Sequence, residues 1–600
     1  MFNFRAYGQD DSTYNEQRKR LFDVNDIFHQ ALNSMKKGPV DTVKEKQLLK
    51  VKSVTPYQKY EGRIIRKIKI TQYGFEKKFI DTSGRISYIG TRILNGLHVN
   101  TQEWVIKNNL FFREGFELDP YIIADNERYL RTLSYIQDTR IIVHPIKKSR
   151  DSVDIEVVTK DLFSITGIAD ASGFHRLKGR VADVNFLGMG QTMQFTTLFD
   201  QTRKPLLGYE FLYSKQNLQR SFIDATVAYS VINQGTNGEE EKAYYIKLDR
   251  PLISPYSHAA GGLTLSKNTA VNNYGVTDSA FFKYKYDIYD VWAGYNLGIS
   301  KLMHDKVKAR DRQFLGIRYF KDHYDIVPLQ VGNRFDPIYN NKQAILGQIT
   351  FFRQDYYKTH YIYGFGTTED FPTGYKIAIT GGWYKQLDLE RPYVGIDANR
   401  YVATTKGDFV QYFFRAGAFK DQGKISDASI LLGANAFGRL FVFNNGLKVR
   451  QNLKLSYARL WNQITYASLR IDNTLGLNDF HSDSLLGQQR ISLYSETILF
   501  TKNKFFGFQF APFVFVNLSG LTPANQDYTK TDLHSGLGGG VRTRNENLVF
   551  GTIEFKAVYF PRKVEGDAQF KITVNSDIRY KYRSTYVSEP DIIQLNSDNN

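Results

Sequence analysis

The feature that most constrains this chain is a run of strand-like segments that continues from residue 162 to residue 586. Within these segments apolar residues alternate with polar or small ones, as in QYFFRAGAF and FGFQFAPFVFV. A period of two predicts strands with one apolar and one polar face. So long an antiparallel sheet would leave exposed edges unless it closed on itself. The sequence therefore predicts a mainly β fold, with an antiparallel transmembrane β-barrel of about sixteen strands.

The composition fits this prediction. The 600 residues include 40 Tyr and 44 Phe but only 4 Trp, and aromatic rings suit both pleated strands and membrane interfaces. The mean hydropathy of −0.40 disfavours a helical membrane protein but not a barrel, because lipid-facing and lumen-facing residues cancel in the average. The strands of a soluble sandwich or multi-blade protein also alternate apolar and polar residues. That interpretation predicts a short internal repeat, and the sequence contains none.

The net charge of +18 indicates an anionic partner. No Lys/Arg block or nucleic-acid-binding motif accompanies the charge, so we expect no nucleic-acid partner. We expect contact with outer-membrane lipid and lipopolysaccharide instead. Cysteine is absent, which excludes a thiolate nucleophile and a Cys-ligated metal.

The chain divides by pattern into four parts. Residues 1–58 hold a helix, predicted over 14–36, and a basic linker; residues 59–161 form a small α+β unit with the order β-α-α-β-β. The barrel occupies 162–586. The polar tail, 587–600, is expected to lie outside the barrel wall.

The N-terminus has no apolar stretch of signal-peptide length. Because an outer-membrane protein must be exported, we expect the sequence to be the mature or trimmed form, or to have a start assigned too late. The position of the export signal is not predicted.

The α+β unit and the barrel together resemble the Omp85 superfamily of BamA/TamA-like outer-membrane proteins, with a single POTRA-like domain. The residues that carry the resemblance share their order and spacing with that family. They are Phe112 to Asp119, Leu130, Arg131, Tyr135 and the segments RIIVHPI and DSVDIEVVTKD in the small unit, and Asn185 to Gly188, Gly190, Gln191, Glu369 to Gly374, Leu486 to Gln488 and the sixth-loop motif in the barrel.

The sixth-loop motif comprises Gly476, Leu477, Asn478, Asp479, Phe480 and the downstream Glu496. The resemblance implies an extracellular loop that folds into the lumen. Family members usually carry an arginine at the loop tip, where this chain has Asn478. An asparagine amide has fewer donors than a guanidinium and no charge. We therefore expect the ionic contact between the loop and a wall carboxylate such as Glu496 to be missing.

The resemblance also implies a bacterial outer-membrane location, with the front domain in the periplasm. It implies a lateral seam between the first and last barrel strands, and an exposed sheet edge on the front domain that binds client segments. The seam candidates are Phe163, Ile165, Gly167, Phe570, Ile572 and Tyr580, and the edge candidates are Ile141, Val143 and Ile68.

Catalytic signatures are missing from the sequence. There is no Gly-x-Ser-x-Gly elbow and no Walker loop, and the glycine run Gly536 to Gly540 is better explained by close packing in a barrel wall. The 10 His lack metal-ligand spacing. Glu369 and Asp370 are expected to form a solvated turn. We therefore expect no enzyme activity, cofactor or bound metal.

The predicted function is the insertion or assembly of outer-membrane proteins. Other outer-membrane or periplasmic proteins would bind through the front domain and the N-terminal helix. Two alternatives remain open: an accessory or structural subunit of a larger outer-membrane assembly complex, and a pore that secretes a specific protein.

Overall fold

A computed structural model of the chain describes residues 51–596 with internal gaps. The longer gaps are 75–98, 298–309, 546–551 and 579–585, and the shorter ones are 148, 173–174, 236–238, 333–335, 337, 367, 387, 445, 481, 483, 503, 506–507 and 565–567. The predicted helix over 14–36 lies outside the described residues.

One antiparallel sheet dominates the fold. It has 23 strands, three of which, β1 (Val51–Lys52), β19 (Phe441–Val442) and β24 (Lys504–Phe505), are two-residue pieces at its rim. The long wall strands are β5 (Ile165–Ser172), β6 (Arg176–Asp183), β7 (Gln191–Asp200), β8 (Leu207–Lys215), β9 (Asp224–Gln234), β10 (Glu240–Arg250), β11 (Ala259–Val271), β12 (Lys285–Leu297), β13 (Asp311–Ile326), β14 (Lys342–Thr359), β15 (Glu369–Gln386), β16 (Leu389–Ala403), β17 (Phe409–Asp421), β18 (Lys424–Phe437), β20 (Lys448–Trp461), β23 (Gln489–Phe500), β25 (Phe508–Thr522), β26 (Asp532–Asn545), β27 (Thr552–Tyr559) and β28 (Phe570–Ile578).

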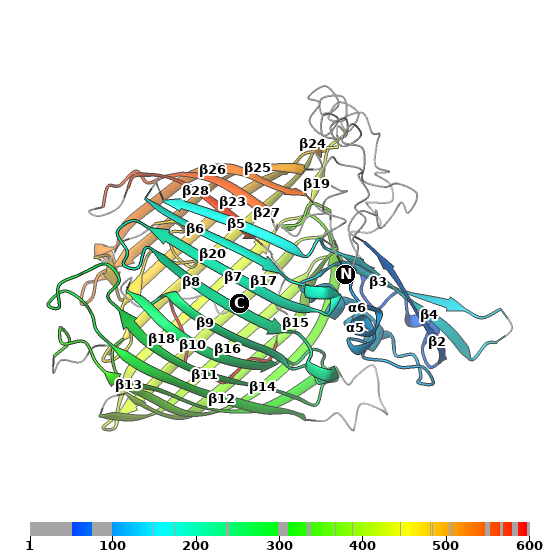
Figure 1. Ribbon diagram of the computed structural model, residues 1–600, viewed down its shortest axis with the longest axis horizontal. Coiled ribbons are helices and arrows are strands. Elements are labelled where there is room, and N and C mark those ends of the chain that lie inside the picture. The colour runs from blue at the N-terminus through cyan, green and yellow to red at the C-terminus, as the bar shows by residue number, and fades with distance from the viewer. Residues whose placement is uncertain are drawn as a thin grey trace, which may run out of the picture.

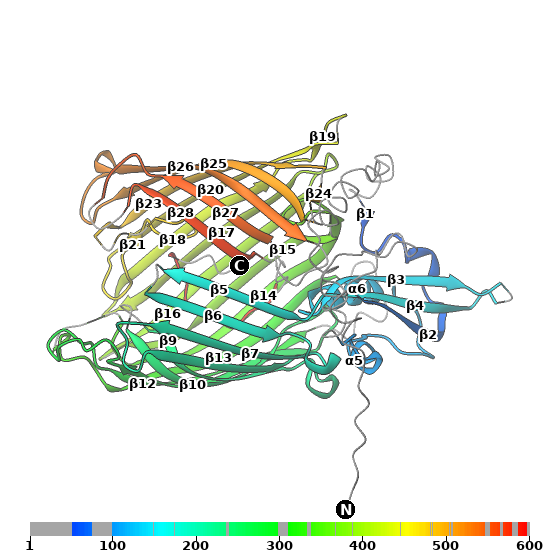
Figure 2. The same ribbon diagram turned by 45° about the horizontal axis from the view of Figure 1, so that its top comes forward.

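Each long strand from β5 to β28 pairs antiparallel with the next long one. The sheet curls until β5 and β28 lie beside each other (Figures 1 and 2). The barrel class predicted from the alternation is therefore confirmed. The wall has more strands than the predicted sixteen because β5 to β8 have only 8 to 10 residues each, so more strands fit the same length of chain.

The two faces of the wall differ as the alternation requires. In β25, Val514 and Val516 are exposed on the outside while Phe513 and Phe515 are buried on the inside. The same pattern leaves a band of exposed aliphatic and aromatic side chains around the outer face, including Ile317, Val394 and Ile491. Among the described helices, none is long and apolar enough to cross a membrane.

The front domain precedes the wall, and its described elements follow the order β-α-α-β-β, with residues 75–98 between the first strand and the first helix left out. Its elements are β2 (Ile64–Tyr73), α5 (Glu103–Asn108), α6 (Pro120–Thr132), β3 (Ile136–Pro145) and β4 (Ser152–Asp161). The sheet order is β2-β4-β3, with β2 parallel and β3 antiparallel to β4. Asp119 caps α6, since its carboxylate accepts hydrogen bonds from the N–H groups of Tyr121 and Ile122.

Both helices lie against one end of the barrel, while the β3–β4 hairpin projects away from it (Figure 1). The turns between β14 and β15 and between β10 and β11 lie at this end, because α6 contacts them. The segment between β20 and β23 therefore belongs to the opposite end. The remaining described elements are short: η1 (Gln58–Tyr60), η2 (Phe186–Gly188), η3 (Leu218–Arg220), η6 (Tyr528–Lys530), β21 (Leu469–Arg470) and β22 (Leu486–Gly487).

The C-terminal tail corrects one expectation. It forms no wall strand, but it does not lie outside the barrel either. Tyr586 is buried beside Phe352 of β14, and its hydroxyl donates to the Thr373 carbonyl of β15. Farther along, the Leu595 carbonyl accepts from Arg490 of β23. A segment that contacts the inner faces of such distant strands runs through the lumen.

Candidate functional site

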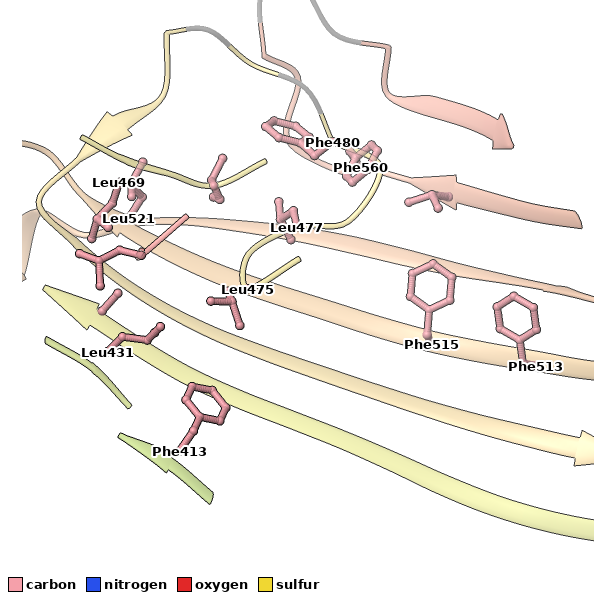
Figure 3. Packing of buried hydrophobic residues seen from close by; sticks show 14 of the residues in the cluster. Phe413, Leu431, Leu469, Leu475, Leu477, Phe480, Phe513, Phe515, Leu521 and Phe560 are labelled. Carbon is pink, nitrogen blue, oxygen red and sulfur yellow. The ribbon is translucent and has the colours of Figure 1, made fainter. Parts of the chain in front are cut away.

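The loop between β20 and β23, residues 462–488, folds into the lumen. Its base is held by the short ladder of β21 and β22. Leu475 and Leu477 lie among wall side chains of the inner face, such as Phe515 (Figure 3). Leu477 is fully buried. The loop therefore adopts the inward position that the resemblance implied, held by the burial of apolar side chains.

The loop tip packs tightly. A Cβ on Gly476 would lie 2.0 Å from the Ile471 carbonyl oxygen, so only glycine fits there. Asn478 is partly buried. The ring of Phe480 packs edge-on against Phe560, with centroids 5.1 Å apart.

The loop tip is bound to the last two wall strands. The Asp479 carboxylate lies 2.5 Å from Lys556 Nζ of β27, and its main-chain carbonyl accepts a 3.1 Å hydrogen bond from Lys571 of β28. The side chains of Asp479 and Lys556 are 17% and 13% exposed. Partial burial of this kind makes an ion pair stronger than one on an open surface. The loop thus joins the lumen to the final hairpin of the wall.

Glu496 has a different partner from the one that the family pattern suggested. Its carboxylate accepts two hydrogen bonds from Arg542 of β26, at 2.6 and 3.1 Å, and one from Tyr494 at 2.8 Å. The described partners of Glu496 are all wall residues, namely Arg542, Tyr494 and Asn452. The loop instead forms an ion pair of opposite polarity, in which the loop supplies the carboxylate of Asp479 and the wall supplies the ammonium of Lys556.

A second cluster of charges joins the front domain to the barrel. Arg131 of α6 donates to the Asp370 carboxylate of β15 at 2.9 and 2.7 Å, and to Glu127 at 2.8 Å. The Arg131 and Asp370 side chains are 7% and 10% exposed. The expectation of a solvated turn at Glu369 and Asp370 is therefore wrong. Glu369 is also engaged, because it accepts the N–H groups of the turn at residues 362–364.

Glu127 lies at the centre of this cluster. It forms ion pairs with Lys358 of β14 and with Arg131, and it accepts hydrogen bonds from the Tyr57 hydroxyl at 2.5 Å and the Ile141 N–H at 2.8 Å. Burial by itself would raise the pKa of Glu127, but Lys358 and Arg131 outweigh burial and lower the pKa to about 2. Glu127 is therefore charged throughout the physiological range.

A third junction connects the end of the front domain to the turn between β6 and β7. Asp161, the last residue of β4, is buried and accepts a 2.6 Å hydrogen bond from the Thr101 N–H. The Thr101 hydroxyl accepts from Asn185, whose own amide oxygen accepts the Gly190 N–H. Asn185 thus links the barrel turn to the front domain. Burial raises the pKa of Asp161 to about 6, although the Thr101 hydrogen bonds oppose this.

The seam candidates occupy different positions. Phe163 is buried beside Leu162, two residues before β5 begins. Ile165 and Gly167 belong to β5, where they pair with Asp183 and Val181 of β6. Phe570 and Ile572 of β28 are exposed on the outer face. Tyr580 lies outside the described residues.

The first and last wall strands, β5 and β28, are hydrogen-bonded neighbours, so their junction closes the sheet. Within the described part of the chain this junction joins strands of only 8 and 9 residues. Figure 2 shows them side by side at the front of the barrel. A thin ladder needs less free energy to open than a full one.

The edge candidates lie on the two outer strands of the front sheet, as predicted. The Ile141 and Val143 side chains point into the core, and Ile68 is partly buried against it. Each backbone edge is partly covered. Segment 115–118 hydrogen-bonds to the start of β2, and side chains of the Glu127 cluster bind the backbone of residues 139–141 in β3. The far end of β3, residues 143–145, has no such cover within the described part of the chain.

The described residues contain no group of His, Cys, Asp and Glu side chains arranged to hold a metal ion. A β-α-α-β-β domain followed by one large antiparallel barrel with an inward loop is the architecture that the Omp85 resemblance implied.

Comparisons with known proteins give similarities at the level of the fold. No family model matches the sequence, and no curated protein matches it. The structure is similar to BamA from Haemophilus ducreyi lacking POTRA domains 1-3, with 12% identity, 86% of this chain and 85% of that chain covered, and a TM-score of 0.31. It is also similar to CdiB from Acinetobacter baumannii (10% identity, 95% and 99% covered, TM-score 0.41) and to CdiB from Escherichia coli (10%, 86% and 76%, 0.40).

Sequence reasoning missed three functional contacts. Arg131 and Asp370 were both noted, but 239 residues separate them and no local pattern pairs them. The Lys556 partner of Asp479 lies in an ordinary alternating strand, with no motif around it. The tail was noted for its polarity, and its apolar residues Ile592, Ile593 and Leu595 were the available signal that it is buried.

We expect Lys556→Met to loosen the loop. Removing the ammonium leaves Asp479 partly buried without its closest cation, at a cost of about 1–3 kcal/mol. Limited proteolysis at the end of the barrel opposite the front domain should therefore cut the loop faster. Lys563→Met, an exposed lysine of the turn after β27, is the matched control. Equal cleavage rates in the two variants would contradict the proposed role of the ion pair.

We expect Arg131→Met to weaken the docking of the front domain by about 3–5 kcal/mol, because two buried carboxylates lose their shared cation. Hydrogen exchange of α6 and the start of β15 should accelerate in the detergent-solubilised chain. Arg113→Met, at an exposed position of the same domain, should leave exchange unchanged. A second variant, Arg131→Met with Asp370→Met, should recover part of the protection, since it removes one of the stranded charges.

The junction at Asp161 predicts a pH dependence. A carboxyl group whose pKa is higher in the folded state than the ordinary value of about 4 favours the folded arrangement at low pH. The free energy that stabilises the junction between Asp161 and Thr101 should fall by about 2 kcal/mol as the pH rises from about 4 to about 6, and it should change little above about pH 6. Hydrogen exchange of α5, compared at each pH with Asp161→Asn, measures this loss. An equal pH response in the variant would show that another group is responsible.

Proposed function

We propose that the protein is a bacterial outer-membrane barrel, with its front domain in the periplasm, and that it assists the insertion or assembly of other outer-membrane proteins. The band of exposed apolar side chains supports the membrane location, because it suits hydrocarbon and the closed sheet satisfies the backbone. The fold supports the general class, and the role follows from the seam.

The observation that carries the proposal is the thin junction between β5 and β28. These strands have 8 and 9 residues, against 18 in β14 and β15. Strands this short have fewer backbone hydrogen bonds to break than the eighteen register pairs between β14 and β15. An edge opened toward lipid offers unpaired N–H and C=O groups to an incoming strand.

The other parts of the site are placed to control this seam. On the β28 side, the inward loop binds Lys556 and Lys571 of the final hairpin. On the β5 side, the Asp161 junction lies four residues before Ile165, where β5 begins. The uncovered end of β3 projects from the front domain and is the candidate for pairing with a client strand. A movement of the loop would therefore displace β28, and a movement of the front domain would displace β5.

Two alternatives fit part of the same geometry. An accessory barrel in a larger assembly would have the same wall, and its seam would stay closed. A secretion pore would require the loop and the tail to leave the lumen. The weak seam favours insertion over both, because neither alternative needs one.

A disulfide across the seam tests the proposal. The chain has no cysteine, so paired substitutions form one defined bridge. Gly167→Cys is combined with Ile572→Cys or with Val574→Cys, whose side chains share the outer face, and each variant replaces the depleted native chain in cells. The outer-membrane proteome is then quantified under oxidising and reducing conditions. We expect oxidation of a bridged variant to cause broad loss of barrels, and reduction to restore them.

The control bridge combines Ala557→Cys with Ile572→Cys, which are directly opposite in the β27–β28 ladder, and it should leave barrel levels unchanged. Selective loss of one secreted protein would instead support the pore. An unchanged proteome, both in depleted cells and in cells with a bridged seam, would support the accessory role and overturn insertion.

A further inference from the structure

The tail residues Tyr586 to Asn596 follow a defined path inside the lumen. Tyr586 and Val587 are buried with Phe352 of β14 and Phe314 of β13, at the end covered by the front domain. Asn596 accepts the Arg470 N–H at 3.0 Å and donates to the Ser468 carbonyl at 3.0 Å, both in the inward loop at the opposite end. An extended segment of this length spans about 30 Å, the thickness of a bilayer core.

Three inner-wall side chains hold main-chain atoms of the tail. Arg318 of β13 donates to the Pro590 carbonyl at 3.0 Å. The Tyr393 hydroxyl of β16 accepts the Ile593 N–H at 2.8 Å, and Arg490 of β23 donates to the Leu595 carbonyl at 2.8 Å. Because these contacts involve the backbone, they bind an extended polypeptide as such.

Two glycines of the inner wall lie directly beside the tail. A Cβ on Gly316 would lie 3.4 Å from the Pro590 ring, and one on Gly417 would lie 3.2 Å from the Ile593 side chain. Ile593 and Leu595 are buried, at 8% and 6% exposure. These features define a luminal groove, lined by Gly316, Arg318, Tyr393, Gly417 and Arg490, that fits the tail in both shape and hydrogen bonding.

Arg490 indicates what happens when the tail leaves. Its side chain is fully buried, and its described acceptors are the Arg470 carbonyl, the Leu595 carbonyl and Asn596. Two of these three belong to the tail. Without them a buried guanidinium would keep one acceptor, and it would favour a water-filled path or another polypeptide in the same place.

We propose that the luminal groove is a peptide-binding site whose resident ligand is the chain's own C-terminal segment, and that this segment is a displaceable plug that keeps the lumen closed. The described contacts of the plug with the wall lie on β13 to β17 and β23, and the plug reaches β28 only indirectly, through the inward loop. It also ties the inward loop to the periplasmic end of the barrel through Asn596.

Conductance of the purified full chain in planar lipid bilayers tests the plug. We expect the full chain to conduct little and a chain lacking residues 586–600 to conduct several-fold more. A synthetic peptide of sequence YVSEPDIIQLN should then close the truncated barrel again, whereas the same peptide with aspartate in place of Ile593 and Leu595 should not. A chain lacking only 597–600, which keeps every described tail contact, should behave as the full chain.

A full-length variant keeps the test decisive if truncation prevents folding. Ile593→Asp combined with Leu595→Asp puts two charges into buried positions and should raise conductance, while Gln594→Asp, at the partly exposed position between them, should not. Unchanged conductance in a folded truncated chain or in the double variant would overturn the proposal, as would equal block by both peptides. A bridged seam leaves this readout unaffected, so the failure of this proposal and that of the insertion proposal are distinguishable.

Discussion

The structure depends on one constraint, the pairing of every backbone N–H and C=O group in a wall whose outer face is apolar. In the proposed membrane location, a sheet that presents Val514, Ile317 and Val394 outward cannot leave its edges open, because no water in hydrocarbon compensates an unpaired group. Closing the sheet satisfies the constraint everywhere except where the first and last strands meet. The weak point of the wall is therefore set by where the chain begins and ends its strands.

On the inner face, the alternation places polar and charged side chains in a confined lumen, where each of them needs a partner. They are satisfied by each other: Arg542 pairs with Glu496, Asp479 with Lys556, and Arg131 with Asp370 at the mouth. Buried pairs of this kind add little net stability, because desolvation offsets their attraction, but they fix which segments lie together. They place the loop, the front domain and the wall relative to one another.

Much of this arrangement was predictable. The alternation gave the barrel, and the switch from helical to strand periodicity gave the order of the front domain and its two edge strands, because these are local signals. The strand number was underestimated because strand length varies from 8 to 18 residues and turns within an alternating run are weakly marked. Asp370 was misread because its partner, Arg131, lies in a different domain.

The sequence by itself determined the class of fold and the absence of cysteine chemistry, because period and composition are properties of neighbouring residues. The inward position of the loop was implied by the resemblance of its motif to the Omp85 superfamily. Only the tertiary structure decided that the tail enters the lumen and that an ion pair between Asp479 and Lys556 holds the loop in place of the expected arginine contact. Each of these depends on residues brought together across the barrel. Closure creates those contacts, and no local pattern records them.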